Sequence, residues 1–184
     1  MAVEPNKIIL DEHMEIRKLL SALDGMAAFS LEKGVFPVED AKRALDIIVE
    51  HVDRCHHGKE EKVLFPVLSG LSPEIGREIA RRLTSDHRGF RRLVANMLGL
   101  VMNLQKDPKA KSLMTKDLST YTRLVRAHMG VEEDVLFKEV ERSIIPSDRA
   151  KISEAFAKFD RDLGNDPRRR CFEEISRLVN IYGY

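Results

Sequence analysis

The sequence predicts an all-α protein, an up-down-up-down four-helix bundle with short helices added at its C-terminal end. Apolar residues recur with helical spacing along most of the 184 residues, whereas the alternation typical of a half-buried strand is nowhere sustained. Breaks containing proline or glycine divide the chain into long segments with short connections, which favours antiparallel neighbours. Apolar residues make up 43% of the chain and charged residues 33%, a composition that suits a soluble helical protein.

The four long helices are expected over residues 5–33, 38–68, 73–105 and 109–143. Pro5 is tolerated in the first turn of the first helix, and Gly34 with Pro37 marks its end. Pro66 is expected to kink or end the second helix, because an interior proline removes a helical hydrogen bond. The stretches SGLSP and KDPK predict the next two turns.

Two shorter helices are expected after Pro146, over residues 147–162 and 167–182, separated by the stretch LGNDP. Their length and position suggest an extension that packs on the bundle. We therefore expect a bundle domain over residues 1–145 and a C-terminal helical extension over residues 146–184.

Charge and composition exclude several classes of partner. The chain has 31 Lys and Arg against 30 Asp and Glu, so its formal net charge of +1 provides no electrostatic reason to expect nucleic acid or an anionic membrane. No run of about 18 apolar residues is present, and the stretch MAVEPNKIILDEH does not read as a secretory signal. Cys55 and Cys171 form no CxxC motif and fit free thiols, which favours the cytoplasm.

One ten-residue motif occurs twice in the sequence. The stretch HHGKEEKVLF begins at His56, and HMGVEEDVLF begins at His128. In each copy a glutamate, Glu60 or Glu132, follows the histidine by four residues. Because residues four apart lie on one helical face, both side chains of each pair can reach the same point. A single HxxxE motif is weak evidence in a glutamate-rich helix, whereas two matching copies are specific.

The other two long helices each hold a histidine close to an acid, DEH at residues 11–13 and DH at 86–87. The four histidines are separated by 43, 31 and 41 residues, a pattern typical of two helical hairpins related by a pseudo-twofold axis. If these faces point inward, four imidazoles and two carboxylates meet in the core, where a carboxylate is costly unless it is paired or bound to metal. Two metal ions would satisfy the cluster. Imidazole and carboxylate donors without thiolate favour iron or manganese, with zinc possible.

These motifs together resemble the hemerythrin-like HHE cation-binding domains over roughly residues 7–142. The resemblance implies a four-helix bundle with a non-heme di-iron centre, bridged by carboxylates and usually by an oxygen species. It implies a protein that binds or senses dioxygen, nitric oxide or peroxide; the alternatives are a di-iron oxidoreductase that consumes oxygen or peroxide, and an iron-storage or structural metal bundle. Carried over by position, the implied metal ligands are His13, His56, Glu60, His87, His128 and Glu132.

A second register is open in the first copy, since His57 and Glu61 are also four residues apart. The internal alignment pairs His57 with Met129, a poor ligand for a hard ion, and so favours His56 with Glu60. We expect His57 behind the ligands or at the surface, and His51 outside the cluster. Glu61 and Glu133 are expected to be solvated or hydrogen-bonded to ligands, with direct contact to a metal as the alternative. Tyr121 is expected in the core, with a redox-active or hydrogen-bonding role beside the centre as the alternative.

The chain departs from the oxygen-carrying members that it resembles. Those proteins have a second histidine four residues after the one in the third helix, where this chain has Arg91. They also have an aspartate five residues after the histidine of the fourth helix, where this chain has Glu133 with Glu132 one position earlier. These departures favour the broader family over its dioxygen carriers, with water or another exogenous ligand in the place of the fifth imidazole.

Overall fold

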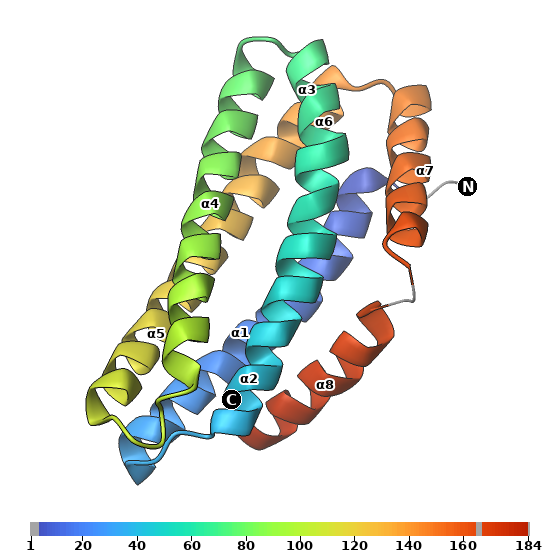
Figure 1. Ribbon diagram of the computed structural model, residues 1–184. Coiled ribbons are helices and arrows are strands. Elements are labelled where there is room, and N and C mark those ends of the chain that lie inside the picture. The colour runs from blue at the N-terminus through green and yellow to red at the C-terminus, as the bar shows by residue number, and fades with distance from the viewer. Residues whose placement is uncertain (1–3, 165–166, 184) are drawn as a thin grey trace.

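The computed structural model describes residues 4–164 and 167–183, and every regular element in those ranges is a helix. Four long helical columns lie side by side (Figure 1). Two of them are single helices, α1 (Pro5–Lys33) and α4 (Ile75–Val101). The second column joins α2 (Val38–Ile47), the π-helical segments η1 (Ile48–His57) and η2 (Glu60–Leu64), and α3 (Phe65–Leu71). The fourth joins α5 (Pro108–Val131), the π-helical segment η3 (Glu132–Leu136) and α6 (Phe137–Ser143).

Most of the breaks between the long helices fall at the proline and glycine residues that predicted them. The first helix ends at Gly34, which adopts a left-handed φ of 69° while its N–H donates to the Ser30 carbonyl at 3.0 Å. Pro66 does not end the second column, because η2 continues directly into α3, which runs on to Leu71. The third column is shorter than predicted, since α4 begins at Ile75 and ends at Val101.

The buried core is divided into two apolar clusters along the columns. The larger includes Ile16, Val52, Phe90 and Val125, whereas the smaller includes Ile9, Leu64, Leu83 and Leu136. On each of the four columns a histidine lies between a residue of one cluster and a residue of the other. The bundle therefore carries a polar layer between two apolar ones.

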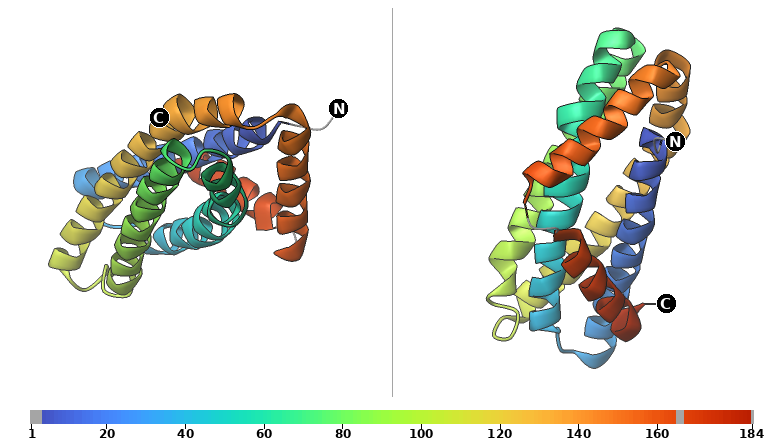
Figure 2. Two further views of the ribbon diagram at one scale, coloured as in Figure 1. Left: turned by 90° about the horizontal axis from the view of Figure 1, so that it is seen from above. Right: turned by 90° about the vertical axis from the view of Figure 1, so that its right-hand side faces the viewer.

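Helices α7 (Pro146–Asp162) and α8 (Pro167–Tyr182) pack against the columns, α7 on α1 and η2, and α8 on α1, α2 and η1 (Figure 2). At Gly25 of α1 an added Cβ would lie only 1.7 Å from the Tyr182 carbonyl oxygen, so only glycine permits this close approach. The Tyr182 hydroxyl donates to Asp40 at 2.7 Å and Arg177 donates to the same carboxylate at 2.6 Å. The turn predicted around Asn165 and Asp166 lies outside the described residues.

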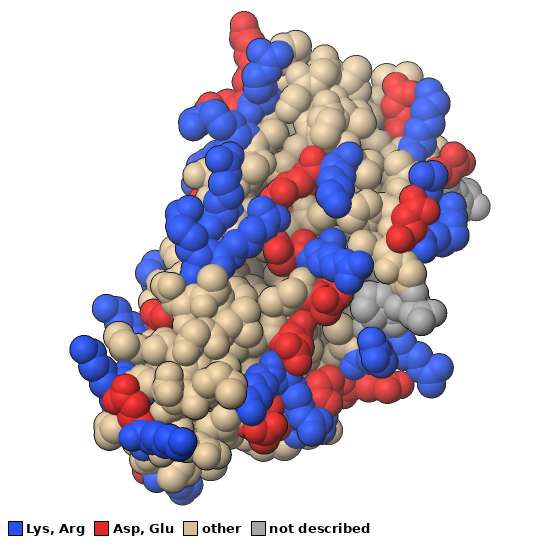
Figure 3. All heavy atoms as spheres, viewed as in Figure 1, with Lys and Arg blue, Asp and Glu red and all other residues tan. Residues whose placement is uncertain are grey.

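Charged side chains of both signs are mixed on the face drawn in Figure 3, and the basic side chains that gather along α4 are arginines. Within the described ranges, no helix combines the length and the apolar character needed to cross a membrane.

Candidate metal centre

Six buried side chains converge in the polar layer of the bundle. Each is at most 2% exposed, and together they form two overlapping groups of four whose donor atoms lie within 4.8 Å of one another. Both groups contain the two glutamates, and each group adds a different pair of histidines. One group is His13, His56, Glu60 and Glu132, and the other is Glu60, His87, His128 and Glu132. The structure thus brings together all six residues of the predicted ligand set.

Each glutamate faces one histidine of each pair, with its two oxygens turned to different pairs. A carboxylate in this orientation can bridge two ions, each of which also takes two imidazole nitrogens. The separations between Nε2 and a carboxylate oxygen are 3.1 Å for His13–Glu132, 3.0 Å for His128–Glu132, 3.8 Å for His56–Glu60 and 3.5 Å for His87–Glu60.

The close atoms of this layer do not satisfy one another. Within the part of the chain that the structure describes, both oxygens of Glu60, both oxygens of Glu132, and the Nε2 atoms of His13 and His56 make no hydrogen bond. Leaving a buried polar atom unsatisfied costs about 1–3 kcal/mol. Lone pairs that converge without donors between them are what a pair of cations requires, so the residues present fit a two-metal centre.

Behind the layer, the second ring nitrogen of each histidine is oriented by a carboxylate. Nδ1 donates to an acid, which fixes the tautomer and leaves the Nε2 lone pair directed into the centre. The acids are borne by helices other than those of the histidines they serve. The four pairs are His13–Glu133 at 2.7 Å, His56–Glu12 at 3.1 Å, His87–Glu61 at 2.8 Å and His128–Asp86 at 3.3 Å.

The four rings do not share one electrostatic environment. Burial lowers the pKa of His56 to about 4, which keeps this imidazole neutral. Burial also acts to lower the pKa of His128, but the charges of Glu132 and Asp86 raise it to about 9. The Nε2 atoms of His87 and His128 lie 3.0 Å apart, so either a proton or a cation must lie between their lone pairs.

The pKa values of the two glutamates are shifted in opposite directions. Burial and the neighbouring charge of Glu132 raise the pKa of Glu60 well above its ordinary range. Burial opposes the charge of Glu132 too, but the adjacent His128 lowers the pKa of Glu132 well below its ordinary range. Burial and mutual repulsion thus disfavour two negative charges side by side in the centre, and bound cations would offset both effects.

Two acids that lie close in sequence to candidate ligands do not contact those histidines. Asp86 directly precedes His87 but accepts a hydrogen bond from His128, and Asp11, two residues before His13, pairs with Lys7 at the surface. Glu61 and Glu133 accept hydrogen bonds from His87 and His13, two of the candidate ligands, as one of the two expectations for them had it.

Lys59 and Glu12 were not singled out by sequence reasoning. The Lys59 side chain is fully buried; it donates to Glu12 and, at 2.9 Å, to Asp160 of α7. Burial would raise the pKa of Glu12, but the hydrogen bond from His56 and the charges of His56 and Lys59 lower it to about 2. A buried cation thus holds the acid that orients His56. No signal in the KEEK stretch distinguishes this lysine from a surface one.

π-Helical segments carry candidate ligands in both copies of the repeated motif. His56 lies near the end of η1, Glu60 begins η2, and Glu132 begins η3. Such turns are rare and occur frequently at functional sites. Helical periodicity alone did not predict them.

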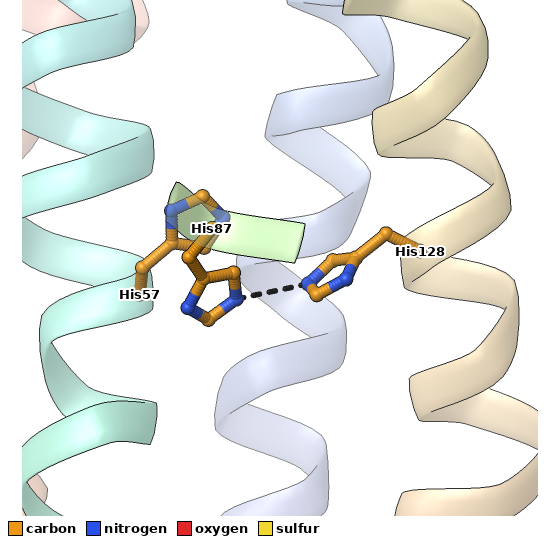
Figure 4. A group of neighbouring side chains, drawn as sticks. All are labelled: His57, His87 and His128. Atoms are coloured by element: carbon orange, nitrogen blue, oxygen red, sulfur yellow. Dashed lines mark hydrogen bonds between the residues drawn. The ribbon is translucent and has the colours of Figure 1, made fainter. Parts of the chain in front are cut away.

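His57 is not at the surface, since it is only 2% exposed. Its ring stacks on that of His87 with centroids 3.8 Å apart and an interplanar angle of 18°, and His128 points toward the same place from another helix (Figure 4). Nitrogens of these three rings lie within 4.8 Å of one another. His51, in contrast, packs against Phe172 of α8 and belongs to none of the donor groups.

Two further residues with open roles lie beside the layer. Tyr121 is buried, packs edge-to-face on Phe90 at 6.1 Å, and lines an apolar cavity of about 170 Å³ that reaches His57. Burial raises its pKa, so the phenol stays protonated. The Arg91 guanidinium donates to Asp53 at 2.7 Å and to Glu61 at 2.9 Å.

A protein-family model described as the hemerythrin HHE cation binding domain matches residues 4–140. No curated protein and no solved structure matches the chain.

Proposed function

The chain belongs to the hemerythrin HHE cation-binding family, and we propose that its bundle holds a di-iron centre that binds or senses dioxygen, nitric oxide or peroxide. The observation that carries this proposal is the set of four buried carboxylate oxygens without hydrogen bonds among the described residues, each facing an imidazole nitrogen. The proposed architecture is an up-down-up-down bundle over residues 1–145 with residues 146–184 packed on it. The proposed ligands are His13, His56, Glu60, His87, His128 and Glu132.

The donor chemistry supports iron. Imidazole nitrogens and carboxylate oxygens suit iron or manganese, with zinc possible, and no thiolate joins the described donor groups. Cys55, although adjacent to His56, directs its sulfur to Asp160 at 3.7 Å. When bound, iron supplies open coordination positions and a reversible change of oxidation state.

The residues of the chain perform three tasks in this proposal. Glu60 and Glu132 bridge the two positions and neutralise part of the metal charge. The carboxylates behind the histidines hold each Nδ1 proton away from the centre, so that every Nε2 lone pair faces inward. The two apolar clusters exclude bulk water from both sides of the layer, which strengthens the electrostatic interactions within it.

Metal content and absorption spectra test the proposal. We expect two irons per chain in protein loaded under anaerobic conditions, and a new near-ultraviolet charge-transfer band on exposure to air. Glu132→Gln should hold at most one iron, whereas the matched control Glu139→Gln, which changes a buried glutamate outside the centre, should hold two. Wild-type protein that holds fewer than one iron, or that stays colourless after iron loading, would contradict the di-iron centre.

The same samples distinguish the alternative functions. Sustained consumption of peroxide by the iron-loaded protein would indicate an oxidoreductase. Spectra that do not respond to oxygen, azide or nitric oxide would indicate a storage or structural role. Reversible spectral changes without turnover are the result expected for a binding or sensing protein.

A further inference from the structure

We propose that the cavity beside the polar layer is a binding site for a small neutral ring compound that carries one hydrogen-bonding group, such as a phenol. This is the cavity of about 170 Å³ that both Tyr121 and His57 line. Binding there requires no metal ion, so this role goes beyond the proposed di-iron function.

The first support is the size and the lining of the cavity. Its walls come from η1, α4 and α5 and are mainly apolar, with Ile48, Val94 and Leu98 among the residues that line it. Phe90 and Tyr121, whose ring centroids lie 6.1 Å apart in an edge-to-face arrangement, add two aromatic walls. An apolar protein cavity of about 150 Å³ is large enough to bind benzene. The cavity of this chain therefore accommodates one six-membered ring.

The second support is a hydroxyl group in the cavity wall that has no partner. Tyr121 is only 1% exposed, and its hydroxyl makes no hydrogen bond within the ranges that the structure describes. Burial and the charge of Asp53 raise the pKa of Tyr121, so its phenol stays protonated and can donate. A buried polar group without a partner is unfavourable, and a ligand that brings an oxygen atom into the cavity would accept this hydrogen bond.

The charged residues of the lining favour a neutral ligand. Asp53 and Arg91 pair at 2.7 Å, and because both side chains are partly exposed they lie on the solvent side of the cavity. The Arg91 guanidinium also donates to Glu61 at 2.9 Å, so two carboxylates already match its single charge. An anion therefore finds no free cation in the lining, and any ion would lose its hydration against the apolar walls.

The cavity adjoins the proposed metal centre at His57. This ring is buried and stacks on the ring of His87, with centroids 3.8 Å apart. A compound bound in the cavity is thus separated from a proposed metal ligand by a single imidazole. The site places an organic molecule beside the centre without taking a coordination position from it.

Calorimetric titration of the full chain with phenol and with benzene, in the presence of chelator, tests the site. Enclosing one ring in apolar surroundings predicts dissociation constants on the order of 0.1–1 mM for both compounds. Tyr121→Phe removes only the hydroxyl, so it should weaken phenol binding about 10-fold and leave benzene binding unchanged. Ala95 lines the cavity from an exposed position of α4, and Ala95→Phe should fill the space and abolish binding of both compounds.

A matched control separates filling of the cavity from the addition of a large side chain to the surface. Ala157→Phe makes the same change at an exposed position of α7 that does not line the cavity, and it should bind both compounds as wild type does. Circular dichroism establishes that each variant is folded. Ala95→Leu replaces Ala95→Phe if that variant does not fold.

Two results would overturn the binding site: no saturable binding of either compound by wild type, or binding that Ala95→Phe leaves unchanged. Phenol affinity that Tyr121→Phe does not alter would overturn the role of the hydroxyl. Because chelator is present throughout, none of these results can come from failure of the di-iron centre, which metal content measures separately.

Discussion

Replacing Glu60 by Met should stabilise the metal-free protein and abolish binding of two irons. Glu60 is fully buried, and neither carboxylate oxygen has a hydrogen bond among the described residues. Met has a similar length and needs no partner. Removing an unsatisfied buried polar group in favour of an apolar one of similar shape is neutral or stabilising. Wild-type stability is therefore lowered in the absence of metal by a side chain that the metal requires.

The size of the effect follows from the two oxygens. At about 1–3 kcal/mol for each unsatisfied buried atom, the substitution removes a cost of about 2–6 kcal/mol. Close imidazoles already offset part of this cost, so a gain of about 2–4 kcal/mol is expected. For a chain of this size each kcal/mol raises Tm by about 2–4 °C, so Tm should rise by about 4–16 °C. With iron at about 1,000 times its Kd, wild type gains about 4 kcal/mol for each bound ion, and the order of the two proteins reverses.

Thermal unfolding with chelator measures the expected rise in Tm of the metal-free variant. Thermal unfolding with iron measures the expected reversal, in which wild type has the higher Tm. The matched control is Glu139→Met, because the buried carboxylate of Glu139 accepts hydrogen bonds from Ser72 and Ser143, each at 2.6 Å, and from Arg142. This control should lower Tm in chelator as well as in iron. If Glu60→Met lowers Tm in chelator as much as Glu139→Met does, then the oxygens of Glu60 are satisfied in the metal-free fold and the reasoning is wrong.

Three further predictions concern the surroundings of the centre. Lys59→Met should destabilise the fold by about 3–5 kcal/mol in urea unfolding, because it leaves the buried carboxylate of Glu12 without its cation. Burial acts to raise the pKa of Asp40, but hydrogen bonds from the C-terminal helix lower it below the ordinary value of 3.8. The stabilisation that the Asp40 carboxylate provides is present above that value and disappears as the pH falls through the pKa of the folded state. Asp40→Asn should therefore flatten the dependence of the free energy of unfolding in urea on pH in the acid range. Glu133→Ala should weaken iron binding by about 10–100-fold in chelator competition, whereas Asp11→Ala should leave it unchanged.

Each of these predictions has a control of its own. Adding Glu12→Gln to Lys59→Met should recover part of the lost stability, and a double variant no better than the single one would contradict the charge argument. Tyr182→Phe removes one donor to Asp40 and should weaken the acid-range dependence only in part. Equal iron affinity in Glu133→Ala and Asp11→Ala would show that the acid behind His13 does not support binding.

Spacing along a single helix predicted the long helices and placed each glutamate on the same face as a histidine. The convergence of six residues from four helices was expected from the repeated motif and the family resemblance, because spacing along one helix does not show which faces turn inward. The acids behind the histidines depend instead on which helices are neighbours. Glu12 and Asp86 each precede a candidate ligand in the chain, yet they face His56 and His128 on other helices. A residue one position from a ligand is turned by about 100° around the helix, so it faces the adjacent column and not its own neighbour. An acid beside each ligand was therefore a usable signal, but its partner required the packing.

The expected division between bundle and extension does not describe how the centre is supported. The Nδ1 of His56 lies 3.1 Å from Glu12, Glu12 accepts from the buried Lys59, and Lys59 donates to Asp160 at 2.9 Å. Asp160 belongs to α7, beyond the residues 4–140 that the family model matches. A buried lysine is costly unless carboxylates surround it, and one of its two carboxylates comes from this helix. The hydrogen bonds that orient a proposed ligand on one face of the centre thus end on the C-terminal segment, which makes α7 part of the support of the site.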